Sequence, residues 1–259
     1  MKGKIITVFY LGIFIIGYFG NSPMAAQNSS AKRKVSAEVK TQSLDLFDKV
    51  RQRLVPVTMY LPEKADGRHK SKRFKIAIIS HGYGGKNTAY SFIAEYLVRR
   101  GYVVASIQHE LASDEPMPLT GTIYETRKPF WERGVQNILF VIEELKKSEW
   151  NLDYKNLLLI GHSNGGDTSM LFASEHPDQA AKIISFDNRR MPFPRQKRPQ
   201  ILSIRSSDQS ADARVLPTAE EQKRFRTKIV KADIIHNDMW DGATEIQKQE
   251  IIEIINGFL

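Results

Sequence analysis

Short apolar runs alternate with amphipathic stretches of helical length along most of the chain. The predicted strands span residues 55–61, 74–80, 102–108, 157–160, 182–186, 200–204 and 228–235. The predicted helices span residues 88–100, 130–147, 168–175, 218–225 and 244–258. Strands that alternate with helices form parallel sheets whose crossover helices cover both faces. We therefore expect an α/β fold, with a doubly wound, mostly parallel sheet.

Three details of this pattern give more specific expectations. Residues 55–61 alternate between polar and apolar as an edge strand does. Asn87 or Thr88 is the expected cap of the helix at 88–100, and Gly101 its stop. Residues 111–129 contain three prolines and no clear period, so we expect a loop or insertion there.

The N-terminus has the layout of a secretory signal peptide. Lys2 and Lys4 precede an uncharged run at residues 5–20, and small residues follow up to Ala26. We expect residues 1–26 to be a signal peptide and the protein to be secreted or periplasmic, with an uncleaved membrane anchor as the alternative. Residues 27–44 are then a polar leader, and residues 45–259 one domain.

Composition narrows the chemistry. The chain of 259 residues contains no cysteine, which excludes disulfides, a thiolate nucleophile and cysteine metal sites. Its formal charge is +9. One basic cluster comprises Arg189, Arg190, Arg195, Lys197 and Arg198. These are either solvated loop residues or a surface for peripheral contact with anionic membranes or substrates. No nucleic-acid recognition module is visible, so we expect no nucleic-acid partner.

The most informative motif is the G-x-S-x-G sequence at residues 161–165, directly after a predicted strand. Gly161 and Gly165 flank Ser163, where the chain has to turn sharply from strand to helix and the backbones crowd. Such a turn presents the serine hydroxyl at a helix N-terminus, where backbone N–H groups stabilise an oxyanion. We predict a nucleophile elbow at Ser163; the alternative is a structural glycine-rich turn.

A serine nucleophile needs a base, and the base needs an orienting acid. On α/β sheets of this kind the chain order is serine, acid, histidine. Of the six histidines, only His236 follows both Ser163 and the candidate acids, directly after the last predicted strand. We predict that His236 is the general base; the alternative is an ordinary surface-loop histidine.

Two aspartates compete for the role of the acid. Asp208 follows the strand at 200–204 by four residues, where the commonest acid of such sheets lies. Asp187 ends the strand at 182–186, which is the known alternative position. The sequence favours Asp208 narrowly, and Asp187 stays open.

The oxyanion hole needs a second donor from the loop after the first buried strand. That loop is His-Gly-Tyr-Gly-Gly at residues 81–85, where glycines let the backbone approach a substrate oxygen. We expect the backbone N–H groups of Tyr83 and Asn164 to be the donors. The alternative is a plain tight turn.

Together these motifs resemble the α/β-hydrolase superfamily, and in particular its branch of platelet-activating-factor acetylhydrolases and dienelactone hydrolases. Residues 80–110 are similar to the oxyanion loop, first helix and next strand of that acetylhydrolase, and residues 186–194 to its acid-bearing segment. In that family the acid lies at the position of Asp187. The resemblance covers most of residues 74–240.

The resemblance implies hydrolysis of carboxylic esters through an acyl-serine intermediate, without a cofactor or a metal. The expected substrate is a small-molecule or lipid ester. Residues 188–198 are too few for a large cap domain, so we expect an open site, partly roofed by residues 111–129. Its expected lining includes Met117, Tyr124, Phe130, Trp131, Met191 and Phe193.

Two other functions remain open. A peptidase or amidase of the same fold shares all of this machinery. The chain could also be a non-catalytic binding protein of the same fold. The presence of all three triad residue types argues against that function.

Overall fold

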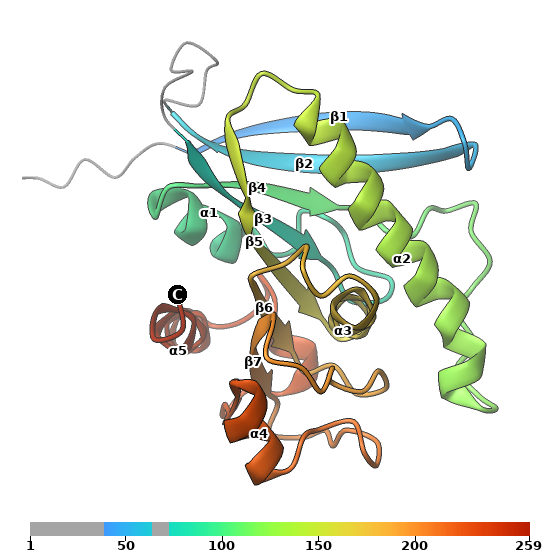
Figure 1. The fold of residues 1–259 in the computed structure, drawn as a ribbon, viewed down its shortest axis with the longest axis vertical. Coiled ribbons are helices and arrows are strands. Elements are labelled where there is room, and N and C mark those ends of the chain that lie inside the picture. Colours follow the sequence, from blue (N-terminus) through green and yellow to red (C-terminus); the bar gives the residue numbers. More distant parts are fainter. Residues whose placement is uncertain (1–38, 64–72) are drawn as a thin grey trace, which may run out of the picture. The chain divides into compact units, whose positions relative to one another are not determined.

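The computed structural model describes residues 39–63 and 73–259 (Figure 1). The expected signal peptide or anchor at residues 1–26 lies outside the described residues, and so does the leader up to residue 38. None of the helices in the described ranges combines the length and the hydropathy that a membrane span requires.

The strands form an eight-stranded sheet with the order β1-β2-β4-β3-β5-β6-β7-β8. Their bounds are β1 Val39–Asp48, β2 Arg53–Pro62, β3 Phe74–Ser80, β4 Tyr102–Ile107, β5 Leu152–His162, β6 Lys182–Phe186, β7 Gln200–Arg205 and β8 Thr227–Lys231. The pairings from β4 through β8 are all parallel. Only β1 with β2 and β2 with β4 are antiparallel. The expected mostly parallel sheet is confirmed.

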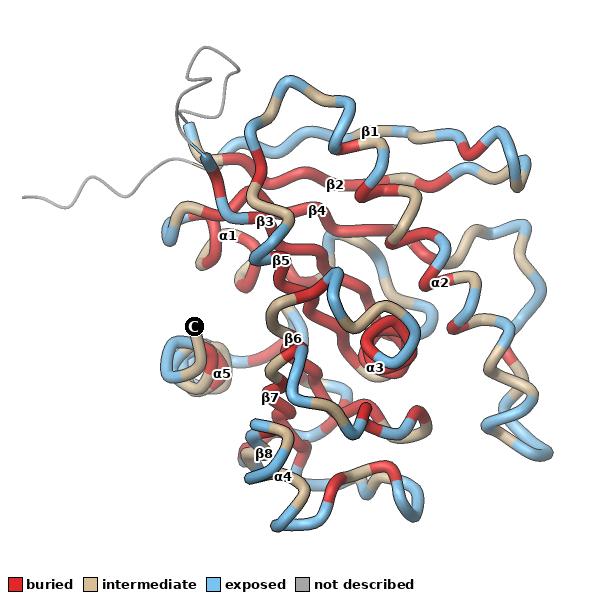
Figure 2. The backbone as a smooth tube through the Cα atoms, viewed as in Figure 1, coloured by how far each residue is buried: buried red, intermediate tan, exposed pale blue. Residues whose placement is uncertain are grey.

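Helices cover both faces of the sheet (Figure 1). Their bounds are α1 Ser91–Arg99, α2 Ile123–Lys146, α3 Asn164–Glu175, α4 Ala219–Phe225 and α5 Glu245–Asn256. One apolar core lies between the sheet, α2 and α3, and a second lies between the sheet, α1 and α5. Along β3, Ile76 and Ile78 enter the first core, whereas Ala77 and Ile79 enter the second. The central strands are therefore buried on both sides, as Figure 2 shows, which is the doubly wound arrangement.

The N-terminal boundary of the domain differs from the expectation. Residues 39–44 belong to β1 rather than to a polar leader, and β1 is the edge strand, whereas β2 lies inside the sheet. An edge strand with one solvated face has few apolar residues: in β1, Leu44 and Leu46 pack against the core and most of the other residues are exposed. That polar composition concealed the strand.

Helix α2 also begins earlier than expected, at Ile123, and contains Pro129. Residues 123–129 are therefore helical, and the expected loop at 111–129 is confined to residues 111–122. Proline removes one backbone N–H donor. Here that loss falls near the N-terminal end of the helix, next to the exposed Tyr124 and Glu125. The buried residues from Trp131 onwards hold the rest of the helix on the sheet.

Candidate active site

The turn from β5 into α3 places Ser163 at the N-terminus of the helix. Ser163 has a φ of 51°, a left-handed conformation that ordinary side chains rarely adopt. A Cβ on Gly161 would lie 2.1 Å from the carbonyl oxygen of Gly165, and one on Gly165 would lie 2.2 Å from that of Ser80. Neither position admits a side chain, so both glycines are required for this turn.

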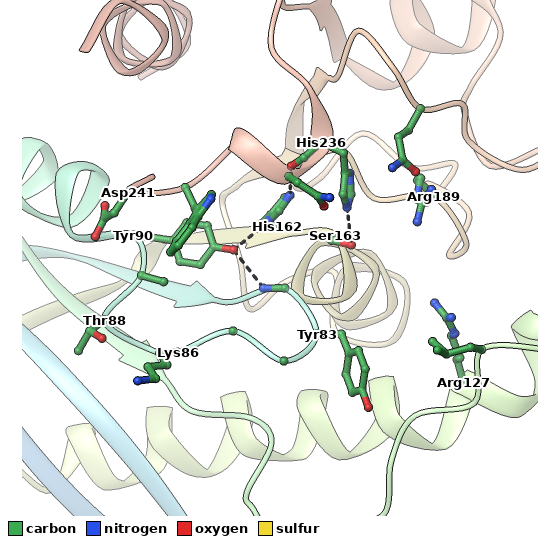
Figure 3. A pocket seen from close by; sticks show the side chains of 18 residues that line it. Tyr83, Lys86, Thr88, Tyr90, Arg127, His162, Ser163, Arg189, His236 and Asp241 are labelled. Carbon is green, nitrogen blue, oxygen red and sulfur yellow. Dashed lines mark hydrogen bonds between the residues drawn. The ribbon is translucent and has the colours of Figure 1, made fainter. Parts of the chain in front are cut away.

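Three residues from distant parts of the chain meet here. The Ser163 hydroxyl oxygen lies 3.0 Å from His236 Nε2, a contact drawn in Figure 3. On the other side of the ring, His236 Nδ1 lies 2.6 Å from Asp187 Oδ2. His236 begins a short 3₁₀ turn after β8, and Asp187 follows β6 directly. This serine–histidine–carboxylate chain is the geometry that activates a hydroxyl nucleophile.

The structure assigns the two competing aspartates to different tasks. Asp187 holds the imidazole ring, whereas the Asp208 carboxylate accepts the backbone N–H of His236 at 2.7 Å. The preference for Asp208 as the residue that orients the ring is therefore corrected. Asp187 has a φ of 54° and is completely buried, with its carboxylate at the Nδ1 edge of the ring. Asp208 lies on the exposed segment after β7, and its carboxylate contacts the histidine loop through the backbone N–H of His236.

The Asp187 carboxylate receives several donors. Ser206 donates through its hydroxyl at 2.8 Å and through its backbone N–H at 3.2 Å, and Arg205 Nη2 lies 2.7 Å from Oδ1. Burial raises the pKa of Asp187, but the hydrogen bonds from His236 and Ser206 and the charge of Arg205 outweigh it. The net result is a pKa below the ordinary value, so the carboxylate is ionised at neutral pH.

The loop at residues 81–85 lies beside the nucleophile. A Cβ on Gly82 would be 3.5 Å from the Ser163 Cβ. The loop is closed by a hydrogen bond from the Gly85 N–H to the Gly82 carbonyl at 2.9 Å. Among the hydrogen bonds of the described residues, the backbone N–H groups of Tyr83 and Asn164 find no acceptor. Both are thus free to donate to a substrate oxygen.

A buried hydrogen-bond chain that sequence reasoning missed connects this loop to His236. His162 Nε2 lies 3.1 Å from the carbonyl oxygen of His236, so this nitrogen carries the hydrogen. His162 Nδ1 then accepts from the Tyr90 hydroxyl at 2.7 Å, and the Tyr90 oxygen accepts from the Gly82 N–H at 3.2 Å (Figure 3). Burial, followed by the proximity of His236, lowers the pKa of His162 to about 3. His162 is therefore neutral, and its hydrogen bonds connect the loop at residues 81–85 to the loop that carries His236.

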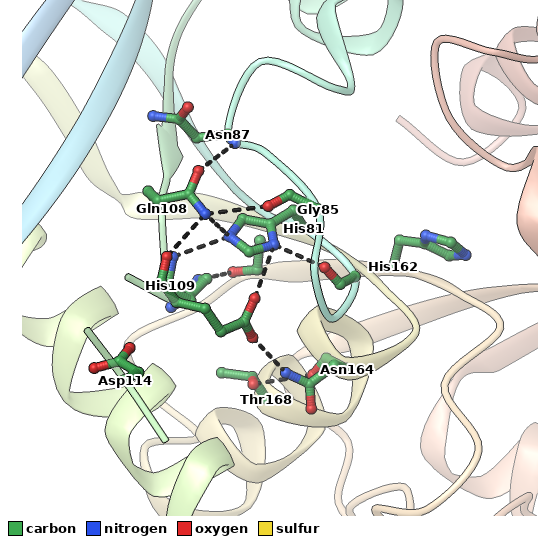
Figure 4. Close-up of polar contacts among 12 residues, drawn as sticks. His81, Gly85, Asn87, Gln108, His109, Asp114, His162, Asn164 and Thr168 are labelled. Atoms are coloured by element: carbon green, nitrogen blue, oxygen red, sulfur yellow. Dashed lines mark hydrogen bonds and ion pairs between the residues drawn. The ribbon is translucent and has the colours of Figure 1, made fainter. Parts of the chain in front are cut away.

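A second missed network supports the other side of the loop (Figure 4). Glu110 Oε1 accepts from the side-chain amide of Asn164 at 3.1 Å, and the Asn164 Oδ1 accepts from the indole N–H of Trp131 at 2.7 Å. Burial raises the pKa of Glu110 to about 7, although a hydrogen bond from the Gly84 backbone opposes the shift. Glu110 thus touches both segments that carry the expected oxyanion donors. No sequence motif identifies Glu110, because only the folded chain brings its partners to it.

Ser163 and His236 face a cleft of about 850 Å³. Its lining includes the exposed side chains of Tyr83, Leu119 and Trp240. None of the six expected lining residues lines this cleft; four of them, Met117, Trp131, Met191 and Phe193, are buried in the protein interior. The sequence alone does not show whether an apolar residue in a loop faces the cleft or the core, so these lining residues could not be predicted.

Three cations also line the cleft: Lys86, Arg127 and Arg189. Figure 3 shows the guanidinium groups of Arg127 and Arg189 extending toward one another on one side of Ser163. Arg127 donates through Nε to the Pro118 carbonyl at 2.9 Å. Burial and the neighbouring arginines lower the pKa of Arg127. Neither arginine forms an ion pair with a carboxylate of the described residues.

The basic cluster predicted from the sequence does not form one free surface. Arg190 pairs with Asp212, Arg195 pairs with Glu221, and Arg198 donates to the backbone of Lys155. Arg189 is the member that faces the cleft. The segment between β6 and β7 contains no helix or strand, so the described residues include no cap domain there. They also contain no group of three or more acidic or histidine residues arranged to hold a metal.

Comparisons with known proteins agree with this fold. The family model described as "Serine aminopeptidase, S33" matches residues 71–187. A ferulic acid esterase from Streptomyces cinnamoneus is 18% identical, with a TM-score of 0.54, over 75% of this chain and 72% of that one. A comparison with curated proteins finds no match.

Two further solved structures are similar over most of their length. The dienelactone hydrolase-like promiscuous phosphotriesterase P91, from metagenomic libraries, is 13% identical with a TM-score of 0.63, over 85% of this chain and 97% of that one. The S-formylglutathione hydrolase FrmB from Staphylococcus aureus is 15% identical with a TM-score of 0.60, over 85% of this chain and 98% of that one. At these identities the similarity establishes the fold.

Proposed function

We propose that this chain, which has the α/β-hydrolase fold, is a serine hydrolase that cleaves carboxylic esters. The observation that carries the proposal is the continuous contact from the Ser163 hydroxyl through the His236 ring to Asp187. A protein that only binds ligands has no need for this contact or for the strained turn that presents the hydroxyl.

In the proposed reaction, Ser163 Oγ attacks the ester carbonyl carbon while its proton passes to His236 Nε2. The carbonyl oxygen becomes an oxyanion, which the backbone N–H groups of Tyr83 and Asn164 stabilise. The bond to the alkoxide then breaks, and His236 returns the proton to the departing alcohol. Water repeats the sequence on the acyl-serine, with Asp187 orienting the imidazole and stabilising its charged form throughout.

The charges in the cleft favour an ester over the peptide N-terminus that an aminopeptidase recognises. A terminal ammonium group needs a carboxylate partner. The one acidic residue that lines the cleft is Asp241. Its two oxygens already accept the backbone N–H groups of Ser91 and Phe92, at 2.9 and 3.1 Å, at the start of α1. The other charged groups of the lining are cations, which repel an ammonium group. An amidase with a neutral or anionic substrate is the second candidate.

Secretion remains part of the proposal, resting on the charge and hydrophobicity pattern of residues 1–26. Fractionation of cells that express the full chain tests it. The proposal expects the mature protein outside the cytoplasm with a new N-terminus near Ala26. An intact N-terminus in the cytoplasm contradicts it.

The hydrolase proposal is tested with p-nitrophenyl butyrate and with butyryl p-nitroanilide, which has the same acyl group. We expect turnover of the ester to exceed that of the anilide, and Ser163→Ala to lower kcat by about 10⁴-fold or more. Ser174→Ala is the matched control, because Ser174 lies in the same helix and bonds only the Met170 carbonyl. Undiminished turnover in Ser163→Ala, or faster cleavage of the anilide, overturns the proposal.

A further inference from the structure

A buried cation lies against the carboxylate that orients His236. Arg205 is the one arginine among the described residues that is buried, with only 8% of its side chain exposed. Its Nη2 lies 2.7 Å from Asp187 Oδ1, and its Nη1 donates to the carbonyl oxygen of Asn188 at 2.6 Å. A charge taken out of water is costly unless it is paired. The contact with the Asp187 carboxylate provides this pairing.

The sheet fixes this contact. Strands β6 and β7 are parallel, with Phe186 paired to Ile204, so Asp187 and Arg205 are the next residues on neighbouring strands. The Asp187 N–H donates to the Ile204 carbonyl at 2.9 Å. The guanidinium group is thus anchored by the sheet, by Asn188 and by Asp187 itself. The backbone register and the contact with Asn188 thus hold the guanidinium group at the carboxylate.

We propose that Arg205 is a positioning residue that favours the neutral form of His236 by compensating the charge of Asp187. In a triad without such a cation, the acid carries the only charge, and protonation of the histidine neutralises the pair. Here Arg205 already offsets the charge of Asp187, so Asp187 stabilises a proton on His236 less than it would without Arg205. Arg205 therefore disfavours the protonated form of His236 and favours the free base that accepts the Ser163 proton.

The other groups around His236 do not replace this effect. His162 packs against the ring at a centroid separation of 4.8 Å and is neutral. The Asp208 carboxylate contacts the His236 backbone rather than the ring. The remaining charged or titratable groups near the ring, its loop or its partners are Tyr90, Asp167, Arg189, Asp238 and Asp241. Of these, Arg189 opposes a proton on His236, as Arg205 does, but from the open cleft where solvent screens it.

This inference deepens the proposed function, because the base it concerns is the base of the proposed reaction. The consequence is that esterase activity extends to mildly acidic pH. Arg205→Gln and Arg205→Met both remove the charge, and Gln retains groups that can bond Asp187 and Asn188. We expect either neutral variant to shift the acidic limb of the pH profile of kcat/KM upward by about one pH unit. Arg205→Lys, which keeps the charge, should leave the acidic limb close to its wild-type position.

The titration of the His236 ring is measured in parallel by NMR, with His236→Gln to assign the signal. This readout needs no substrate, so the inference is decided even if the chain proves not to hydrolyse esters. We expect the titration midpoint to rise in each neutral variant that folds and to stay close to the wild-type value in Arg205→Lys. Arg195→Gln is the control, because Arg195 pairs with Glu221 away from the ring. An unchanged midpoint in a folded neutral variant shows that Arg205 is only structural and overturns the inference.

Discussion

At the scale of single residues, the site depends on which oxygen meets which nitrogen of His236. Asp187 contacts the ring at Nδ1, and Asp208 contacts the backbone N–H of the same residue. The first contact sets the tautomer that can accept the Ser163 proton. The second fixes the loop that carries the ring. The two carboxylates therefore make separable contributions, which substitution can distinguish.

Replacement of each aspartate by asparagine tests this division. Asp187→Asn should lower kcat by about 10⁴-fold, because the amide no longer supports the required tautomer or the imidazolium. Asp208→Asn should cost less than about 10-fold, because the amide oxygen still accepts the His236 N–H. Steady-state kinetics on p-nitrophenyl butyrate measure both. A larger loss in Asp208→Asn than in Asp187→Asn contradicts the assignment.

The sequence identified Ser163 and His236, because a motif marks the first and chain order marks the second, and the structure brings these two together. It could not decide between Asp187 and Asp208. Both follow strands whose carboxyl ends meet at the same edge of the sheet, and the decision lies in the positive φ of Asp187. Arg205, His162 and Glu110 were not found, because their partners are 17 to 74 residues away and no local pattern relates them.

At the scale of elements, the expected sheet and helices are present. The predicted helix boundaries are wrong where tertiary contacts, rather than the local sequence, decide where a helix begins. Helix α1 begins at Ser91 rather than Thr88, because Asp241, from the loop before α5, caps its first N–H groups. Neither Asn87 nor Thr88 is its cap. In the same way, Glu110 ties the loop at residues 81–85 to the start of α3. These distant carboxylates position the elements that form the cleft.

The burial of Glu110 predicts a pH-dependent stability. Burial raises its pKa to about 7 in the folded protein, from an ordinary value of 4.5. As pH rises from 4.5 to 7, the unfolded chain therefore releases a proton that the folded protein retains, and stability falls. The wild type should lose about 3 kcal/mol of unfolding free energy relative to Glu110→Gln between pH 4 and pH 8. Urea denaturation at both pH values measures it.

The control for this experiment is Glu125→Gln, at an exposed position in the first turn of α2. Its stability relative to the wild type should be nearly the same at both pH values. A constant difference between the wild type and Glu110→Gln across this range shows that Glu110 is not held protonated by burial.

At the scale of the whole molecule, the cleft combines exposed apolar side chains with cations that come from separate parts of the chain. Lys86 lies after β3, Arg127 on α2 and Arg189 after β6. Because Arg127 and Arg189 form no ion pair with a carboxylate of the described residues, the cleft should prefer an ester that carries a negative charge.

Two p-nitrophenyl esters of succinic acid, one with a free carboxylate and one with that group methylated, test this preference. The double variant Arg127→Gln/Arg189→Gln should lose about 10-fold or more in kcat/KM on the anionic ester and little on the neutral one. Arg190→Gln is the control, because Arg190 is already paired with Asp212 and does not line the cleft. Equal losses on both esters show that the arginines do not recognise charge.

The most direct test of the central claim is covalent labelling by a fluorophosphonate, followed by mass spectrometry of the intact and digested protein. Phosphonylation requires a hydroxyl activated by a nearby base. The account predicts one added phosphonyl group per chain, located on Ser163, absent in Ser163→Ala and strongly slowed in His236→Gln. Labelling at another residue, or labelling that persists in Ser163→Ala, contradicts it.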